Sequence, residues 1–257
     1  MKKVANWRAS VAFYWREVQV AKATVQELMP HLLGTPFLSE KDRADLIHVL
    51  RTFKEIMAGS GLIYWLDYGT LLGAWRWGNP LPWDHDADIG YLAGQWQLLQ
   101  ARVPAFADYG MTFRLGGYGQ ILYESIYVDI MPWSEHGGMM ARPDHRQYEA
   151  GFLKALSDRY DTFPSHWVNP LGEIYFAGDY FNCSNQVEPF LRKRYGNIDI
   201  LVPHRVKALL YPQFYRYYWI FARYRPQIRA AAVPQQWTTV TNPAILQKFG
   251  IEDGPKP

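Results

Sequence analysis

The chain has 257 residues, of which 49% are hydrophobic and 20% charged, and its formal net charge is +3. These are the proportions of a globular protein with a sizeable core, and they exclude a low-complexity chain. The single cysteine, Cys183, excludes an internal disulfide and a cysteine-rich zinc site. We expect one domain over residues 1–257, with N-terminal helices (1–60), a core (61–142) and a C-terminal part of helices and loops (143–257).

Two helices are predicted before the core. The first covers residues 11–33 and is interrupted at Pro30. The second covers the stretch SEKDRADLIHVLRTFKEIMAGSG, in which Ser39 and Asp42 resemble a capping box. Its apolar residues recur at helical spacing, at Leu46, Leu50, Phe53 and Met57. The apolar run at the N-terminus is too short for a signal peptide and has no cleavage site, so we expect this end to belong to the fold.

The core predicts an α+β fold with a mixed sheet and helices on one side of it. GLIYWLDYG is expected to be a buried strand, and TLLGAWRWG a short helix from Gly69 and Thr70 to Gly78. A strand follows at residues 86–92, and then a helix whose length is limited by Pro104. MTFRLGG and GQILYESIYVDIMPW are predicted as strands because they are rich in β-branched and aromatic residues. Beyond residue 142, frequent prolines indicate helices and loops, a helical C-terminal extension.

The stretch LPWDHDADIGYL places aspartates at alternate positions 84, 86 and 88. On a strand these side chains would share one face. Asp86 and Asp88 would repel each other by about 1 to 4 kcal/mol at 4 Å, and their apolar neighbours indicate partial burial. A divalent cation would offset this cost, and carboxylate oxygens suit Mg²⁺ or Mn²⁺. The alternative is a solvated edge strand. For Asp84, a turn position and a supporting position near the site both stay open.

Two further features favour a phosphate-binding metal site over an edge strand. Asp129 is a lone acid in the apolar run IYVDIMPW, which is typical of a third ligand on a neighbouring strand. Gly69 and Thr70 lie between a strand and a helix, where free N–H groups favour phosphate. Arg76, later in that helix, would either contact phosphate or extend along Trp75 and Trp77. This set suits metal-assisted phosphoryl transfer.

At these residues the sequence resembles the nucleotidyltransferase fold of the DNA polymerase β superfamily. The stretch LDYGTLLGAWRWGNPLPWDHDADIGY is similar to the LicD and fukutin-related branch, whose signature runs Gly-Ser/Thr-Leu-Leu-Gly, Arg, and Pro-Trp-Asp-x-Asp-x-Asp. Downstream, FPSHWVNPLGEIYFAG and NQVEPFLRKRYGNIDILVP resemble C-terminal landmarks of the branch. The resemblance spans residues 62–203. Thr70 replaces the more usual Ser, and the cysteine-based zinc site of some animal members is absent.

The resemblance implies transfer of a phospho-alcohol, such as phosphocholine or ribitol phosphate, from a CDP-linked donor to a glycan hydroxyl with release of CMP. By position, Asp86, Asp88 and Asp129 would hold Mg²⁺ or Mn²⁺, and Asp129 is a candidate to accept the proton of the acceptor. Gly69 and Thr70 would contact the donor phosphates. A nucleotidyltransferase that releases pyrophosphate and a catalytically silent binding protein are the two alternatives.

Other charged residues carry weaker signals. We expect Asp67 to be structural, and His85 to be buried on the opposite face of the strand from the aspartates. Residues 192–194, Arg-Lys-Arg, would form a solvated helix face or meet a nucleotide or anionic acceptor. None of the other histidines shows helical metal-ligand spacing.

The C-terminal segment 200–251 is basic and aromatic. It has no acidic residue and carries seven basic ones, Arg205, Lys207, Arg216, Arg223, Arg225, Arg229 and Lys248. We expect either ordinary aromatic packing or peripheral contact with an anionic membrane, which would suit a lipid-linked glycan acceptor. Nucleic-acid binding is the less favoured interpretation. With one cysteine and no leader, the expected location is cytoplasmic.

Overall fold

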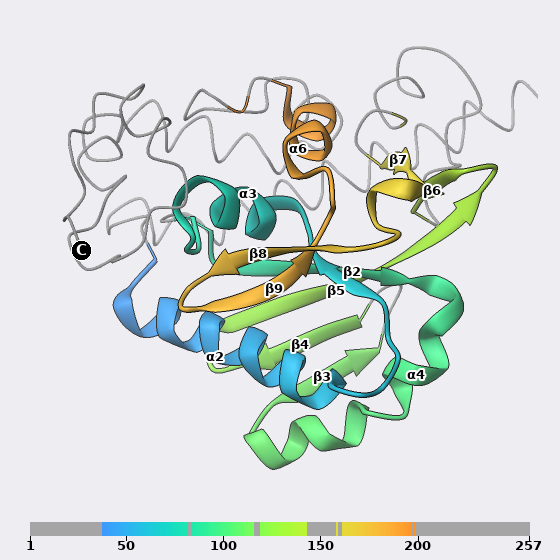
Figure 1. Cartoon of the computed structure of the whole chain (residues 1–257). Coiled ribbons are helices and arrows are strands. Elements are labelled where there is room, and N and C mark those ends of the chain that lie inside the picture. The colour runs from blue at the N-terminus through green and yellow to red at the C-terminus, as the bar shows by residue number, and fades with distance from the viewer. Residues whose placement is uncertain are drawn as a thin grey trace, which may run out of the picture.

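The computed structural model describes residues 38–81, 84–115, 119–142, 158, 161–196 and 198. The predicted helix over 11–33 and the basic segment 200–251 lie outside these residues. Within them the fold is α+β, as expected (Figure 1). The proposed division of the whole chain into one domain stays a prediction.

The central sheet is mixed and has the strand order β1-β2-β5-β4-β3, with β6 paired to the end of β5 and β7 paired to β6. Only β2 and β5 run parallel within it, whereas the other pairs are antiparallel. The strands are β1 (Tyr64–Leu66), β2 (Asp86–Leu92), β3 (Thr112–Leu115), β4 (Gly119–Tyr123), β5 (Ile126–His136), β6 (Met139–Ala141) and β7 (Thr162–Pro164).

One stretch that the sequence predicts as a single strand, 119–133, forms a hairpin instead. Tyr123 pairs with Ile126, which leaves a two-residue turn at Glu124 and Ser125. Glu124 has a φ of 51°, the left-handed conformation that such tight turns use. Because this turn contains no glycine or proline, the sequence pattern gives no clear signal for it.

Helix α2 (Glu40–Met57) covers one face of the sheet. Its N-terminus is capped as predicted, because the Ser39 hydroxyl accepts a hydrogen bond from the Asp42 N–H at 3.0 Å. Its apolar stripe is buried, and the Phe53 ring packs edge-on against Tyr64 of β1 with centroids 5.0 Å apart. The apolar positions predicted from the helical spacing are therefore the ones that the helix buries.

Helices also cover the opposite face, contrary to the expectation of helices on one side. Helix α3 (Tyr68–Trp77) and helix α6 (Val187–Tyr195) lie together there, apart from α2 (Figure 1). Phe163 joins this second layer to the sheet: its ring centroid lies 4.8 Å from that of Trp133 and 4.7 Å from that of Phe190. The reason is that Trp133 of β5 projects from the same face as the aspartates and needs apolar cover.

The remaining elements are short. After β2 come η2 (Ala93–Gln95), α4 (Trp96–Gln100) and η3 (Val103–Tyr109), so the predicted helix changes to 3₁₀ geometry around Pro104. After β7 come η5 (Ser165–Trp167) and the hairpin β8 (Gly172–Phe176) and β9 (Asp179–Cys183), where the sequence predicted helices and loops. Among the helices that the structure describes, none has the length and hydropathy needed to cross a bilayer.

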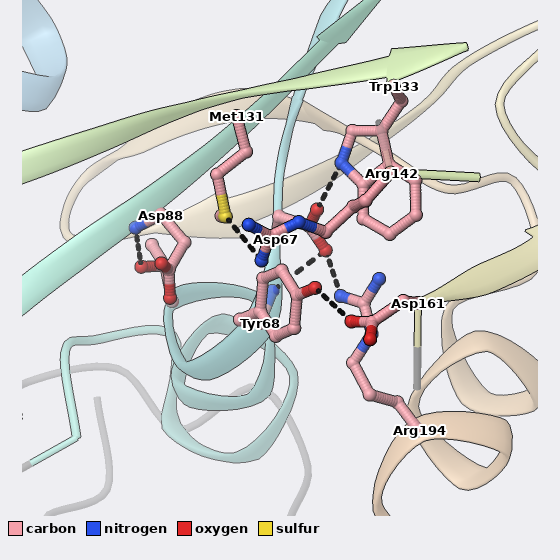
Figure 2. A network of polar contacts seen from close by, with 9 residues as sticks. Asp67, Tyr68, Asp88, Met131, Trp133, Arg142, Asp161 and Arg194 are labelled. Atoms are coloured by element: carbon pink, nitrogen blue, oxygen red, sulfur yellow. Dashed lines mark hydrogen bonds and ion pairs between the residues drawn. The ribbon is translucent and has the colours of Figure 1, made fainter. Parts of the chain in front are cut away.

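A buried ion pair ties α6 to the start of α3. The Arg194 guanidinium pairs with the Asp67 carboxylate, and the two side chains are 3% and 0% exposed. Asp67 also caps α3 by accepting from the Tyr68 N–H at 2.9 Å, and it accepts from Trp133 Nε1 at 3.0 Å. The guanidinium lies over the Tyr68 ring, 3.8 Å from its centroid (Figure 2). Arg194 is therefore neither on a solvated helix face nor available to a nucleotide, and Asp67 is structural, as expected.

We predict that Gly90→Ala destabilises the protein. The Trp65 ring occupies the space above Gly90, its pairing partner across the strands, and an added Cβ would lie 2.6 Å from ring atoms. Because the ring is fully buried, we expect a loss of about 1 to 3 kcal/mol in the free energy of unfolding, measured by urea denaturation. Gly94→Ala is the matched control, since nothing lies within 4 Å of its added Cβ. Equal stability of the two variants would contradict this packing.

Arg194→Met is expected to lower the free energy of unfolding by about 3 kcal/mol or more, because it leaves the buried Asp67 carboxylate without its cation. Lys54→Met is the control: Lys54 Nζ lies 2.8 Å from Asp179, and these side chains are 38% and 37% exposed, so the loss should stay below about 1 kcal/mol. The double variant Asp67→Asn/Arg194→Met should be less destabilised than the sum of its single changes. Additive losses would show that the pair is not coupled.

Candidate active site

The register of β2 and β5 brings the three predicted aspartates to one face of the sheet. Asp88 lies directly opposite Asp129 in the parallel pair, and Asp86 lies opposite Tyr127. Paired residues on neighbouring strands project to the same side, and so do residues two apart on one strand. Asp86, Asp88 and Asp129 therefore form one carboxylate cluster, while Ala87 between them is buried in the core.

The carboxylate cluster is electrostatically costly. Burial, followed by the charges of Asp86 and Asp129, raises the pKa of Asp88 well above its ordinary value. Burial also raises the pKa of Asp129 to about 6, although a hydrogen bond from Gln120 opposes the shift. Acids crowded in this way hold their full negative charge reluctantly. The donor set, three carboxylates and no sulfur or imidazole, fits a hard divalent cation such as Mg²⁺ or Mn²⁺.

Neighbouring side chains hold two of these carboxylates in place. The Tyr127 hydroxyl donates to Asp86 Oδ2 at 3.0 Å, and Gln120 Nε2 donates to Asp129 Oδ1 at 2.8 Å. In the described part of the chain, no three or more His, Cys, Asp or Glu side chains already form a set of metal ligands. The three carboxylates share one face of the sheet.

The start of α3 supports β2 from the side. The Thr70 hydroxyl accepts a hydrogen bond from the backbone N–H of Asp88 at 2.8 Å, which fixes this strand against the helix. A Cβ at Gly69 would overlap Asp84 Oδ2, so the glycine admits that carboxylate to the first turn of the helix. Asp84 is buried, and a negative charge at a helix N-terminus is favourable. Asp84 thus supports the helix beside the site, the role that the sequence left open.

A second glycine of α3 serves packing in the same way. A Cβ at Gly73 would lie 2.6 Å from the carbonyl oxygen of Asn79 and 3.1 Å from the backbone nitrogen of Leu81. The two glycines therefore let residues 79–81 and Asp84 lie directly on the helix. Contact of Gly69 and Thr70 with a donor phosphate stays a prediction.

Arg76 is fully buried, and its guanidinium lies over the Trp77 ring, 5.8 Å from the centroid, which agrees with the second of the two roles that the sequence left open. Its Nη2 donates to the carbonyl of Ile198 at 2.7 Å, and contact of Arg76 with a phosphate stays a prediction. One sequence expectation is wrong. His85 is exposed, not buried, because β2 begins only at Asp86 and the alternation of the strand does not yet apply to it.

Sequence reasoning missed several groups at the site. Gln120 lies on β4 opposite Asp129, and the sequence did not indicate it because the turn of this hairpin carries no clear signal. Arg142 and Tyr195 also had no signal in the sequence. Arg142 acts on Asp129 from the end of β6, and the buried hydroxyl of Tyr195 is close enough to Asp88 for that charge to help raise the pKa of Tyr195, after the larger effect of burial. Only the packing of distant segments brings these two to the cluster.

Comparisons with known proteins agree with the resemblance seen in the sequence. Residues 61–186 match the family model described as LicD/FKTN/FKRP, nucleotidyltransferase domain. The chain is 30% identical over 155 residues to Ribitol 5-phosphate transferase FKRP of Mus musculus, and equally to that of Homo sapiens, with 55% of this chain and 29% of each relative covered. The chain thus spans less than a third of the length of these relatives.

Among solved structures, the lincosamide antibiotic adenylyltransferase LnuA, with lincomycin bound, matches at 18% identity and a TM-score of 0.35. The match covers 62% of this chain and 88% of LnuA, and its TM-score is too low to support a conclusion. The residues that match the family model include α3, β2 and β5, the elements that build the carboxylate cluster. Residues 61–186 of this chain are therefore similar to the nucleotidyltransferase domain of the LicD/FKTN/FKRP family.

Proposed function

We propose that this chain is a metal-dependent transferase that moves a phospho-alcohol from a CDP-linked donor to a hydroxyl of a glycan and releases CMP. The observation that carries the proposal is the pairing of Asp88 with Asp129 across β2 and β5, with Asp86 beside them. Partly buried carboxylates whose pKa values are raised, here those of Asp88 and Asp129, are typical of a catalytic centre. The match of residues 61–186 to the family model, and the similarity to transferases named for ribitol 5-phosphate, support the phospho-alcohol as the transferred group.

Asp86, Asp88 and Asp129 would hold Mg²⁺ or Mn²⁺, which when bound would offset the negative charge of the diphosphate. The acceptor hydroxyl would attack the phosphorus that carries the alcohol, forming a new phosphorus–oxygen bond. The bond from that phosphorus to the oxygen of CMP would break, and CMP would leave with the electron pair. Asp129 would accept the proton of the hydroxyl as the new bond forms.

The cellular setting belongs to the same proposal. The acceptor would be a glycan, either free or linked to lipid. A cytoplasmic location with peripheral membrane contact through residues 200–251 would bring a lipid-linked acceptor to the site, and that segment lies outside the described residues. Nucleic acid is not expected as a partner.

Asp88→Asn is expected to lower metal-dependent turnover by roughly 10²- to 10³-fold, because the change removes a charge that the cation would bind. CMP release is measured with a panel of CDP-alcohols and glycan acceptors in Mg²⁺, and pyrophosphate release is measured with nucleoside triphosphates and the same acceptors. Asp108→Asn, at an exposed acid of η3, is the control and should keep full turnover. Release of pyrophosphate in place of CMP would favour a nucleotidyltransferase, and full turnover by Asp88→Asn would end the proposal.

Asp129→Asn is expected to stabilise the metal-free protein at neutral pH. The pKa of Asp129 is raised from 3.8 to about 6 in the folded state, so the folded chain holds this proton more tightly than the unfolded chain. The free energy of unfolding of the wild type therefore falls as pH rises from about 4 to about 6. At pH 7.5 in EDTA the variant should be more stable by about 1 to 3 kcal/mol, and the difference should vanish below pH 4.

Urea denaturation with and without Mg²⁺ measures this difference. Mg²⁺ should stabilise the wild type and leave Asp129→Asn nearly unchanged, because binding to the folded state alone raises stability. Equal stability of both proteins at pH 7.5 in EDTA would show that the Asp129 charge is not costly. An equal response of both proteins to Mg²⁺ would show that Asp129 is not a metal ligand.

A further inference from the structure

Arg142 lies beside the carboxylate cluster although it is distant from it in sequence. Its backbone N–H donates to the carbonyl of Asp161 at 3.2 Å, which anchors it between β6 and β7. Its side chain returns toward β5, where Nη1 lies 3.9 Å from the sulfur of Met131 (Figure 2). Met131 follows Asp129 by two residues on the same strand, so both project from the same face. The guanidinium therefore lies next to the cluster, on its face of the sheet.

The charge of Arg142 reaches groups on two sides. Burial raises the pKa of Asp129, and the positive charge of Arg142 acts against that effect. Burial likewise raises the pKa of Tyr68, and Arg142, together with Arg194, again acts in the opposite direction. Tyr68 begins α3, next to Gly69. The guanidinium thus lies between the carboxylate of β5 and the first turn of α3.

The other arginines around this face differ from Arg142 in their surroundings. Arg194 is buried against Asp67, and Arg76 is buried against the carbonyl of Ile198. Arg114 is exposed on β3, and β4 lies between β3 and Asp129. Arg142 combines a position beside Asp129 with partial exposure to solvent. It is therefore the arginine of the described residues that is best placed to meet a ligand at the cluster.

We propose that Arg142 is an anion-binding residue of this site and that it takes a non-bridging oxygen of the diphosphate of a nucleoside diphosphate ligand. A guanidinium presents a planar set of N–H donors that matches phosphate oxygens. A diphosphate placed against three carboxylates needs cations on more than one side, and an arginine at the rim supplies one that is always charged. This inference deepens the proposed function, because the donor proposed there is a nucleoside diphosphate derivative.

Calorimetric titration with CDP in Mg²⁺ tests the role of Arg142 on the full chain. Arg142→Gln should raise the Kd for CDP roughly 10- to 100-fold and should flatten the dependence of log Kd on log salt. Arg142→Lys should bind CDP with an intermediate Kd, because an ammonium keeps the charge and loses the fork. Arg102→Gln, at an exposed arginine after α4, is the matched control and should bind CDP as the wild type does.

A structural role would give a different pattern. If Arg142 only balances the acids, Arg142→Gln should lose stability in urea and bind CDP normally, which would overturn the inference. Equal weakening by Gln and Lys, with matching losses of stability, would overturn it as well, and so would failure of the wild type to bind CDP. The proposed function is tested separately, by measuring CMP release. Weaker CDP binding by Arg142→Gln therefore supports the inference even if no CDP-alcohol is turned over.

Discussion

The parallel pairing of β2 and β5 is the constraint on which the candidate site depends. It places Asp88 against Asp129 on one face, with Asp86 one step along the same strand. Carboxylates crowded in a partly buried place repel one another, and the raised pKa values of Asp88 and Asp129 express that repulsion together with the cost of burial. A divalent cation would stabilise this arrangement, because it would offset both the repulsion between the carboxylates and the free-energy cost of burying them.

The first turn of α3 is the frame that holds this arrangement. Thr70 fixes the backbone of Asp88, and Gly69 leaves room for the carboxylate of Asp84. The start of the helix is itself held by Asp67, whose partner Arg194 comes from α6. A buried ion pair is costly when either member is missing. Helix α6 and the carboxylate cluster are therefore structurally coupled, even though they lie far apart in sequence.

The two arginines near the cluster differ in their exposure to solvent. Arg194 is buried and forms an ion pair with Asp67, so it stabilises the folded state. Arg142 lies at the edge of the same region, on Met131, where its charge still reaches Asp129. Because a partly exposed cation is accessible to ligand and a fully buried one is not, arginine has a structural role at position 194 and suits a binding role at position 142.

The sequence by itself determined the local features: the cap at Ser39, the strand that begins at Asp86, and the shared face of the aspartates, because capping and strand alternation depend on near neighbours. Tertiary structure alone decided what depends on contacts between distant segments. It buried Arg76, covered both faces of the sheet with helices, and brought Arg142 to Asp129. No periodicity encodes these contacts, since the register of β6 and the docking of α6 arise only when the whole chain packs.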